Sequence, residues 1–101
     1  MPAVTRVGDK DIPHCTTPLR ARGSRNVFCN GIPVSREGDP NTIHHCPPHT
    51  QSHPFCSTHT ASISKGSSTV FINNRGCGRI GDKIAGCTAV AQGSPNVFAG
   101  G

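Results

Sequence analysis

The sequence predicts an all-β protein, built as a small cone-shaped, pseudo-threefold array of β-hairpins. Gly (12) and Pro (9) are abundant among the 101 residues, and no long apolar run has the helical period, so a helical bundle is excluded. A pattern of 17 residues occurs twice in full and once divided between the two ends of the chain. Turn-forming Asn-Gly and Gly-Asp steps recur in it, and we expect one domain over residues 1–101.

The repeat has the form G-S-x-x-V-F-x-N-x-x-x-x-x-R-x-G-D. It matches residues 23–39 (GSRNVFCNGIPVSREGD) and 66–82 (GSSTVFINNRGCGRIGD) without a gap. Its first nine positions recur in residues 93–101 (GSPNVFAGG), and its last eight in residues 2–9 (PAVTRVGD). The two termini therefore complete a third copy, which predicts a closed ring with adjacent termini rather than an open solenoid.

Each copy is expected to form one hairpin. The V-F-x-N run has the alternating character of a short strand. Asn30–Gly31 is a strong hairpin-turn signal, and Asn73–Asn74 is its weaker counterpart. The return strand is expected to run to Arg36 or Arg79, where Gly-Asp closes the unit with turn chemistry.

The predicted core is small, because hydrophobic residues make up 33% of the chain and there is no Trp or Tyr. Three of the four Phe share one repeat position, so threefold closure would place them equivalently around the axis. We expect the core to consist of Phe28, Phe71 and Phe98, with Val27, Val70 and Val97 beside them. So little apolar material calls for additional stabilisation by a disulfide, a metal or a partner.

The net charge of +5 is spread along the chain as single Lys and Arg residues, except between Arg20 and Arg25. That stretch has no interleaved aromatic residue, so it is interpreted as a solvated loop, and no nucleic-acid partner is expected. No run approaches the roughly 20 apolar residues of a membrane span. Residues 1–10 have no apolar segment of a signal peptide, so the protein is expected to be made in the cytoplasm.

The connections between the copies (residues 10–22, 40–65 and 83–92) carry all six His. His14 and His44 stand at the same offset after the repeat Gly-Asp, while the third connection is shorter and has no His. The long connection adds a C-x-x-H pair, Cys56 and His59, whose spacing lets a thiolate and an imidazole bind one metal.

These four residues make a candidate zinc site. The threefold arrangement places His14 and His44 near one axis, and Cys56 and His59 would complete a set of three nitrogens and one sulfur. Such a closed tetrahedral set is typical of structural Zn²⁺. Alternatives remain at two of the positions, which are His45 in place of His44 and Cys46 or Cys15 in place of Cys56.

The other cysteines are expected to pack rather than to bind metal. Cys29 and Cys77 lie at non-equivalent places in the hairpins, and a disulfide from Cys46 to Cys15 or Cys87 is the less favoured alternative. An enzyme is not expected, because four protein ligands leave no open metal position and no nucleophile-elbow motif occurs.

The segment Pro33-Val34-Ser35-Arg36, followed by Gly38-Asp39, resembles the Pro-Ala-Ala-Arg motif of PAAR-repeat proteins. The flanking G-S-x-x-V-F-x-N-G and the terminal GSPNVFAGG resemble that family as well, so the likeness covers essentially the whole chain. The other two copies keep the Arg and the Gly-Asp but replace the Pro-Ala-Ala residues.

The resemblance implies a cone whose flat base caps the trimeric β-helical spike of a type VI secretion system or contractile phage tail, one chain per trimer. It implies a sharp tip that punctures a target membrane and is stabilised by Zn²⁺, carried over here to His14, His44, Cys56 and His59. It further implies release through the contractile machine or presence in a virion tail. Family members often carry appended toxin domains, whereas this chain is expected to be a bare tip or one that recruits effector proteins non-covalently. The alternative is a small basic binding module stapled by zinc.

Overall fold

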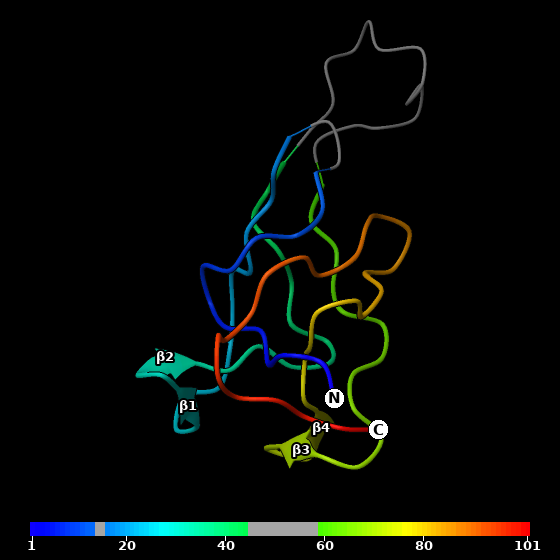
Figure 1. Ribbon diagram of the computed structural model, residues 1–101. Helices are drawn as coiled ribbons and strands as arrows, with labels where there is room; N and C mark the ends of the chain where they lie inside the picture. Colours follow the sequence, from blue (N-terminus) through cyan, green and yellow to red (C-terminus); the bar gives the residue numbers. More distant parts are fainter. Residues whose placement is uncertain (14–15, 45–58) are drawn as a thin grey trace, which may run out of the picture.

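The computed structural model describes residues 1–13, 16–44 and 59–101. Within these ranges there is no α-helix, and the strands form two antiparallel hairpins of two-residue strands (Figure 1). β1 (Phe28–Cys29) pairs with β2 (Ile32–Pro33), and β3 (Phe71–Ile72) pairs with β4 (Arg75–Gly76). The all-β prediction is therefore confirmed. The same ranges contain no helix of the length and apolar character that crossing a membrane requires.

Left-handed residues form both hairpin turns. Asn30 and Gly31 have φ angles of 56° and 76°, and Asn73 and Asn74 have φ angles of 54° and 67°. A positive φ at both central residues is the type I′ turn, whose twist matches that of the flanking strands. The predicted turns are thus confirmed. The return strands end after two residues, sooner than expected, because the chain then crosses to the neighbouring unit.

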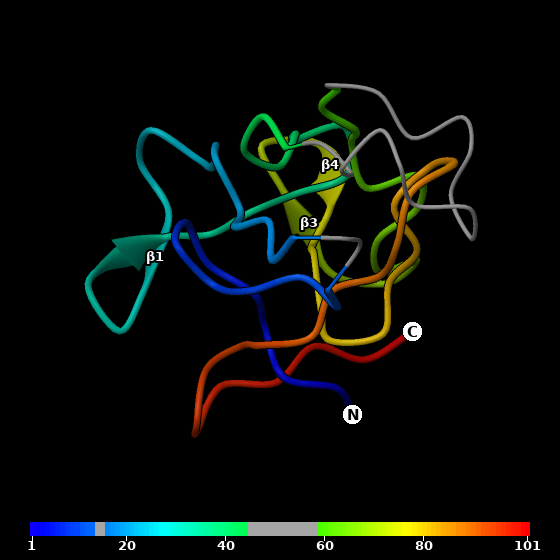
Figure 2. The same ribbon diagram turned by 90° about the horizontal axis from the view of Figure 1, so that it is seen from above.

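The two termini build the third unit, as the repeat predicts. Ala3 and Phe98 form an antiparallel bridge, and the Ala99 N–H donates to the Pro2 carbonyl at 3.0 Å. Equivalent bridges then join the fourteenth repeat position of each unit to the twelfth of the next; they are Arg6 to Val34, Arg36 to Cys77 and Arg79 to Val4. These bridges close a ring, and Figure 2 shows the three units around one centre.

An Arg–Asp fork closes each unit. The R-x-G-D segments place a glycine at φ between 88° and 91°, the left-handed third position of a type II turn. The guanidinium groups of Arg6, Arg36 and Arg79 donate to the carboxylates of Asp9, Asp39 and Asp82, at distances of 2.8 to 3.2 Å. The structural role of the repeat Asp is therefore confirmed.

The same guanidinium groups also bind the eighth repeat position of a neighbouring unit. Arg6 and Arg36 donate through Nη1 to the side-chain oxygens of Asn30 and Asn73, at 3.1 and 3.0 Å. The divided copy has glycine at this position, and there Arg79 donates to the backbone carbonyl of Gly100 at 2.9 Å. A carbonyl oxygen of the main chain thus takes the place of the missing amide oxygen and keeps the ring nearly symmetric.

The core of the hairpin ring differs from the prediction. Phe28, Phe71 and Phe98 are 56%, 59% and 51% exposed, so the expectation that they form the core is wrong. It is wrong for Val70 and Val97 as well, which are also exposed. The buried cluster consists of Val4, Cys29, Val34, Cys77 and Ala99, with Val27 and Ile72 packed against it. Successive side chains of a strand point to opposite faces, and the smaller residue after each Phe faces the crowded axis. The two hairpin cysteines are packing residues, as predicted.

The connections form a second layer, which extends away from the hairpins (Figure 1). Its segments are joined by antiparallel bridges, among them Lys10 to Leu19, Arg20 to Asn41, Ile63 to Ile84 and Lys83 to Ala89. A second apolar cluster of Ile63, Ile84 and Val90 lies inside this layer, and all three are at most 2% exposed. Cys87 packs against this cluster, and His44 and His59 lie beside Cys87.

Arg20 lies inside the second layer and not in solvent. It donates from Nε and Nη2 to the carboxylate of Asp11, at 3.0 and 2.8 Å, and from Nη1 to the carbonyl of Asp39 at 3.1 Å. Interpreting the Arg20–Arg25 stretch as a solvated loop is therefore wrong for Arg20. The interpretation is confirmed for Arg22 and Arg25, which are exposed.

Candidate metal centre

Two histidines face each other in the second layer. The backbones of His44 and His59 exchange two hydrogen bonds, at 3.0 and 2.9 Å, in an antiparallel bridge. Directly opposed residues of such a pair place their side chains together. The two imidazole centroids are accordingly 4.2 Å apart, with the ring planes at 65°. Backbone pairing alone thus holds two nitrogen donors side by side.

Cys87 brings a thiol to this pair from the third connection. Gly86, at a φ of 63°, allows a tight turn that the Cys87 N–H closes on the Ile84 carbonyl at 3.0 Å. The Cys87 Sγ lies 3.2 Å from Nε2 of His44 and 3.6 Å from Nε2 of His59. Tetrahedral zinc, with Zn–N of about 2.0–2.1 Å and Zn–S of about 2.3 Å, requires N···S distances of roughly 3.6 Å. The three donor atoms, all within 4.8 Å of one another, fit three corners of a metal site.

The imidazole of His44 is oriented to bind a metal through Nε2. Its Nδ1 lies 2.8 Å from the carbonyl oxygen of Thr42. A carbonyl only accepts hydrogen bonds, so Nδ1 carries the proton of the neutral ring and Nε2 presents the lone pair. Metal-bound histidines commonly have their second nitrogen held in this way. His44 is also buried, since the residue is only 4% exposed.

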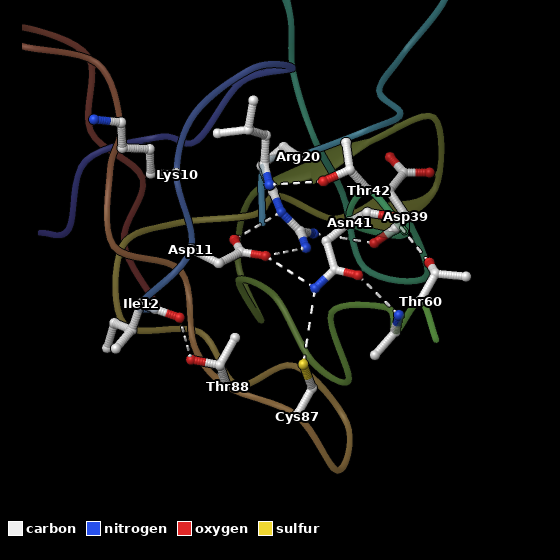
Figure 3. Close-up of polar contacts among 12 residues, drawn as sticks. Lys10, Asp11, Ile12, Arg20, Asp39, Asn41, Thr42, Thr60, Cys87 and Thr88 are labelled. Atoms are coloured by element: carbon white, nitrogen blue, oxygen red, sulfur yellow. Dashed lines mark hydrogen bonds and ion pairs between the residues drawn. The ribbon is translucent and has the colours of Figure 1, made fainter. Parts of the chain in front are cut away.

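A buried polar network supports the thiol. Asn41 donates from its amide nitrogen to Oδ2 of Asp11 at 3.1 Å and to Sγ of Cys87 at 4.0 Å, and its oxygen accepts from the Ala61 N–H at 2.9 Å (Figure 3). Burial raises the pKa of the Cys87 thiol above its ordinary value, while the hydrogen bond from Asn41 opposes that shift. A cation held by Cys87 and the two imidazoles would instead favour the thiolate, and its binding would release the thiol proton.

The structure brings together two of the four predicted ligands, His44 and His59. The other two, His14 and Cys56, lie outside the described residues, as do the alternatives His45, Cys15 and Cys46. The thiol that does lie beside the two imidazoles belongs to Cys87, which was not predicted to bind metal.

The sequence contains a signal for Cys87. It stands five residues after the repeat Asp of its unit, and His14 and His44 stand five residues after theirs. The three positions are therefore equivalent under the pseudo-threefold, although one of them carries sulfur in place of nitrogen. Comparing the connections by position, without regard to residue type, identifies the thiol.

Comparison with known proteins places the chain in a family. A family model described as the PAAR motif matches residues 7–90. The chain belongs to the PAAR-motif family. The resemblance drawn from the repeat is thereby confirmed, and the matched range includes both complete copies and Cys87. The PAAR domain is a structural part of the spike tip of type VI secretion systems, and its members are associated with effector toxins.

Two curated relatives are each 33% identical to this PAAR domain over 91 residues, or 90% of the chain. One is the NAD(P)(+) glycohydrolase toxin Tse6 of Pseudomonas aeruginosa PAO1, of which the match covers 21%. The other is the (p)ppApp synthetase toxin Tas1 of Pseudomonas aeruginosa UCBPP-PA14, of which it covers 20%. The PAAR domain described here thus spans about a fifth of the length of these relatives.

Proposed function

We propose that this PAAR domain is the tip of a type VI secretion spike. Its hairpin end caps the trimeric β-helical spike, one chain per trimer, and its opposite end is cross-linked by Zn²⁺ and leads the spike through a target membrane. The chain leaves the producing cell with the machine and serves as a carrier of effectors. Membership of the PAAR-motif family supports a role at the spike tip, and the exposed phenylalanines support docking of the hairpin end on the spike.

The exposed phenylalanines are the single observation that carries the docking. Phe28, Phe71 and Phe98 occupy one repeat position, and each is more than half exposed. Phe28 and Phe98 line an apolar cavity of about 270 Å³ together with the buried cluster around Cys77, and Ile72, the neighbour of Phe71, lines it as well. Exposing three of four aromatic residues is unfavourable for a free monomer, and contiguous apolar surface marks an interaction site.

A trimeric partner suits this surface for geometric reasons. The hairpin ring is closed by three equivalent bridges, so its three Phe are related by a pseudo-threefold axis. The blunt end of a three-chain β-helix has the same symmetry and exposes unpaired strand edges. One chain with internal threefold repetition can therefore cover all three partner chains at once.

The zinc site of the proposal consists of His44, His59 and Cys87, completed by His14 on the strength of its repeat offset, with Cys56 as the alternative fourth ligand. Zn²⁺ would supply no chemistry beyond a cross-link between the connections. Such a cross-link offsets the loss of chain entropy in segments with few apolar side chains, so binding free energy becomes folding free energy. This cross-link would make the tip of the domain rigid.

The docking is tested by mixing the chain with its cognate spike trimer and measuring the mass of the complex by light scattering. The test variant replaces Phe28, Phe71 and Phe98 with Ser. The control variant replaces three exposed apolar residues of the second layer, Ile12, Leu19 and Ile43, with Ser. We expect one native or control chain per trimer and a loss of binding for the Phe variant. A Phe variant that binds as the native chain does, or three chains per trimer, would contradict the proposal.

A further inference from the structure

Four arginines line one cavity at the boundary between the two complete repeat units. The cavity has a volume of about 660 Å³ and is lined by Arg22, Arg25, Arg36 and Arg75, with Asn26 and Asn73 beside them. Its lining, within the described part of the chain, includes no acidic residue. We call it the arginine pocket. It shares no lining residue with the apolar cavity beside the phenylalanines.

Three of these four guanidinium groups are not engaged in closing the ring. Arg36 forms the turn fork with Asp39 and donates to Asn73. Arg75 donates from Nη1 to Oδ1 of Asp39 at 3.4 Å in a long ion pair, and its side chain is 51% exposed. Arg22 and Arg25 are exposed, and no ion pair within residues 1–13, 16–44 and 59–101 includes either of them.

The fold does not require these three cations. The internal repeat provides the comparison, because the same positions occur in the other two units. The position of Arg22 is Lys65 and Gln92 in the other units, that of Arg25 is Ser68 and Pro95, and that of Arg75 is Ile32 and Pro2. Each position carries an uncharged residue in at least one other unit that closes the same ring. The charge is therefore concentrated at one of three otherwise equivalent boundaries, as expected for a ligand site.

We propose that the arginine pocket binds an acidic segment of a partner protein through its carboxylates. A guanidinium group presents a planar fork of donors that matches a carboxylate with two hydrogen bonds, so several of them around one cavity select a run of Asp or Glu. No aromatic residue lines the pocket, whereas grooves for single-stranded nucleic acid combine basic residues with aromatic stacking platforms. The pocket and the apolar cavity beside the phenylalanines are lined by different residues, so binding of an acidic partner need not involve the residues proposed to dock the spike.

The test measures the binding of a fluorescein-labelled hexaglutamate peptide by fluorescence anisotropy at low and at physiological ionic strength. The pocket variant combines Arg22→Gln, Arg25→Ser and Arg75→Gln, of which the first two install the residues found in other units. The control variant combines Lys10→Gln, Lys65→Gln and Lys83→Gln, so it loses the same charge from exposed sites elsewhere. We expect the pocket variant to bind about tenfold more weakly or worse, and the control to change by less than about threefold.

Three results would overturn the proposal. They are the absence of binding to the native chain, equal losses in the two variants, and tighter pocket-dependent binding of a thymidine oligonucleotide of equal charge. Equal losses of affinity in the two variants would mean that the peptide binds through the net charge of the protein. Tighter binding of the oligonucleotide would mean that the pocket is a nucleic-acid site. Urea unfolding checks that the pocket variant is folded. If that variant does not fold, the single substitution Arg25→Ser is tested in its place, and a smaller loss of affinity is expected.

Discussion

The guanidinium of Arg20 and the carboxylate of Asp11 form an ion pair with two hydrogen bonds, and both side chains are completely buried. The pair lies in the layer that carries the candidate metal centre, and Asn41 connects its carboxylate to the Cys87 thiol. A buried pair of this kind is not a strong source of stability in itself. Removing one partner is nevertheless costly, because the remaining charge is left without compensation in a medium of low dielectric constant.

Replacing Asp11 with Asn should therefore destabilise the protein strongly. We expect the free energy of unfolding, measured by urea titration, to fall by about 3–5 kcal/mol. Arg75→Gln is the control, because its contact with Asp39 is half exposed and should contribute no more than about 1 kcal/mol. Equal effects of the two substitutions would contradict the assigned role of the buried pair.

Replacing Cys87 with Ala should abolish metal binding. We expect native protein to carry about one Zn²⁺ per chain and to lose thermal stability on chelation, because folding and metal binding are coupled. The Cys87→Ala variant should contain almost no zinc by elemental analysis and melt at a temperature that chelator does not change. Cys29→Ala is the matched control, since Ala99 stands at the same repeat position, and it should keep its zinc. Retention of zinc by Cys87→Ala would refute the assignment.

The same measurement identifies the fourth ligand. If His14 completes the site, His14→Ala should lower zinc affinity as much as His44→Ala does, and Cys56→Ala should have little effect. The opposite ranking would assign the fourth position to Cys56. The equal offset of His14, His44 and Cys87 after the repeat Asp favours the first result.

Alkaline solution should destabilise the protein through Cys77. Burial raises the pKa of this thiol from 9.0 to about 11. The unfolded chain therefore loses the thiol proton at lower pH than the folded chain, and stability should fall between pH 9.0 and about 11. The loss attributable to this thiol is at most about 3 kcal/mol. Val4 and Val34 stand at the same repeat position as Cys77, so Cys77→Val is the matched substitution. The free energy of unfolding of this variant should depend less on pH over that range. Parallel pH profiles would show that Cys77 is not responsible.

Two buried serines should respond in opposite directions to substitution by Ala. The Ser35 hydroxyl has no hydrogen-bond partner among the described residues, whereas the Ser24 hydroxyl accepts from the Val27 N–H at 2.9 Å and donates to Asn73. Removing an unsatisfied buried hydroxyl avoids its desolvation cost, so Ser35→Ala should raise the free energy of unfolding by about 1 kcal/mol. Ser24→Ala should lower it by about 1–2 kcal/mol. A loss of stability in Ser35→Ala would indicate a hydrogen bond that the described residues do not supply.

The repeat and its turns were predictable because their causes are local. Asn30–Gly31 and the Gly-Asp steps record backbone angles that few other residues adopt, and those angles recur where expected. Ring closure followed from the division of one copy between the two termini. The candidate metal centre was partly predictable, since His44 and His59, two of its three residues, were already indicated by the sequence.

Which side chains of each strand face the core, and which face solvent, was not predictable. Side chains alternate along a strand, so Phe28 and Cys29 point to opposite faces. The sequence of a two-residue strand does not indicate which of the two faces lies toward the axis. Packing of the three units around that axis places the small side chain inside and leaves the aromatic ring for a partner. Hydrophobicity alone therefore favoured the wrong residue.

Contacts between segments that meet only on folding determined the remaining features. Arg20 is buried because folding brings it against Asp11 from the opposite side of the first connection, and no local property of a basic loop indicates that pairing. Cys87 reaches the two imidazoles of the candidate metal centre only when the third connection packs beside the His44–His59 pair. The conformation of each turn depends on the residues of that turn, so it can be predicted from the sequence. Burial and the geometry of the candidate ligands depend on segments that meet only in the folded ring.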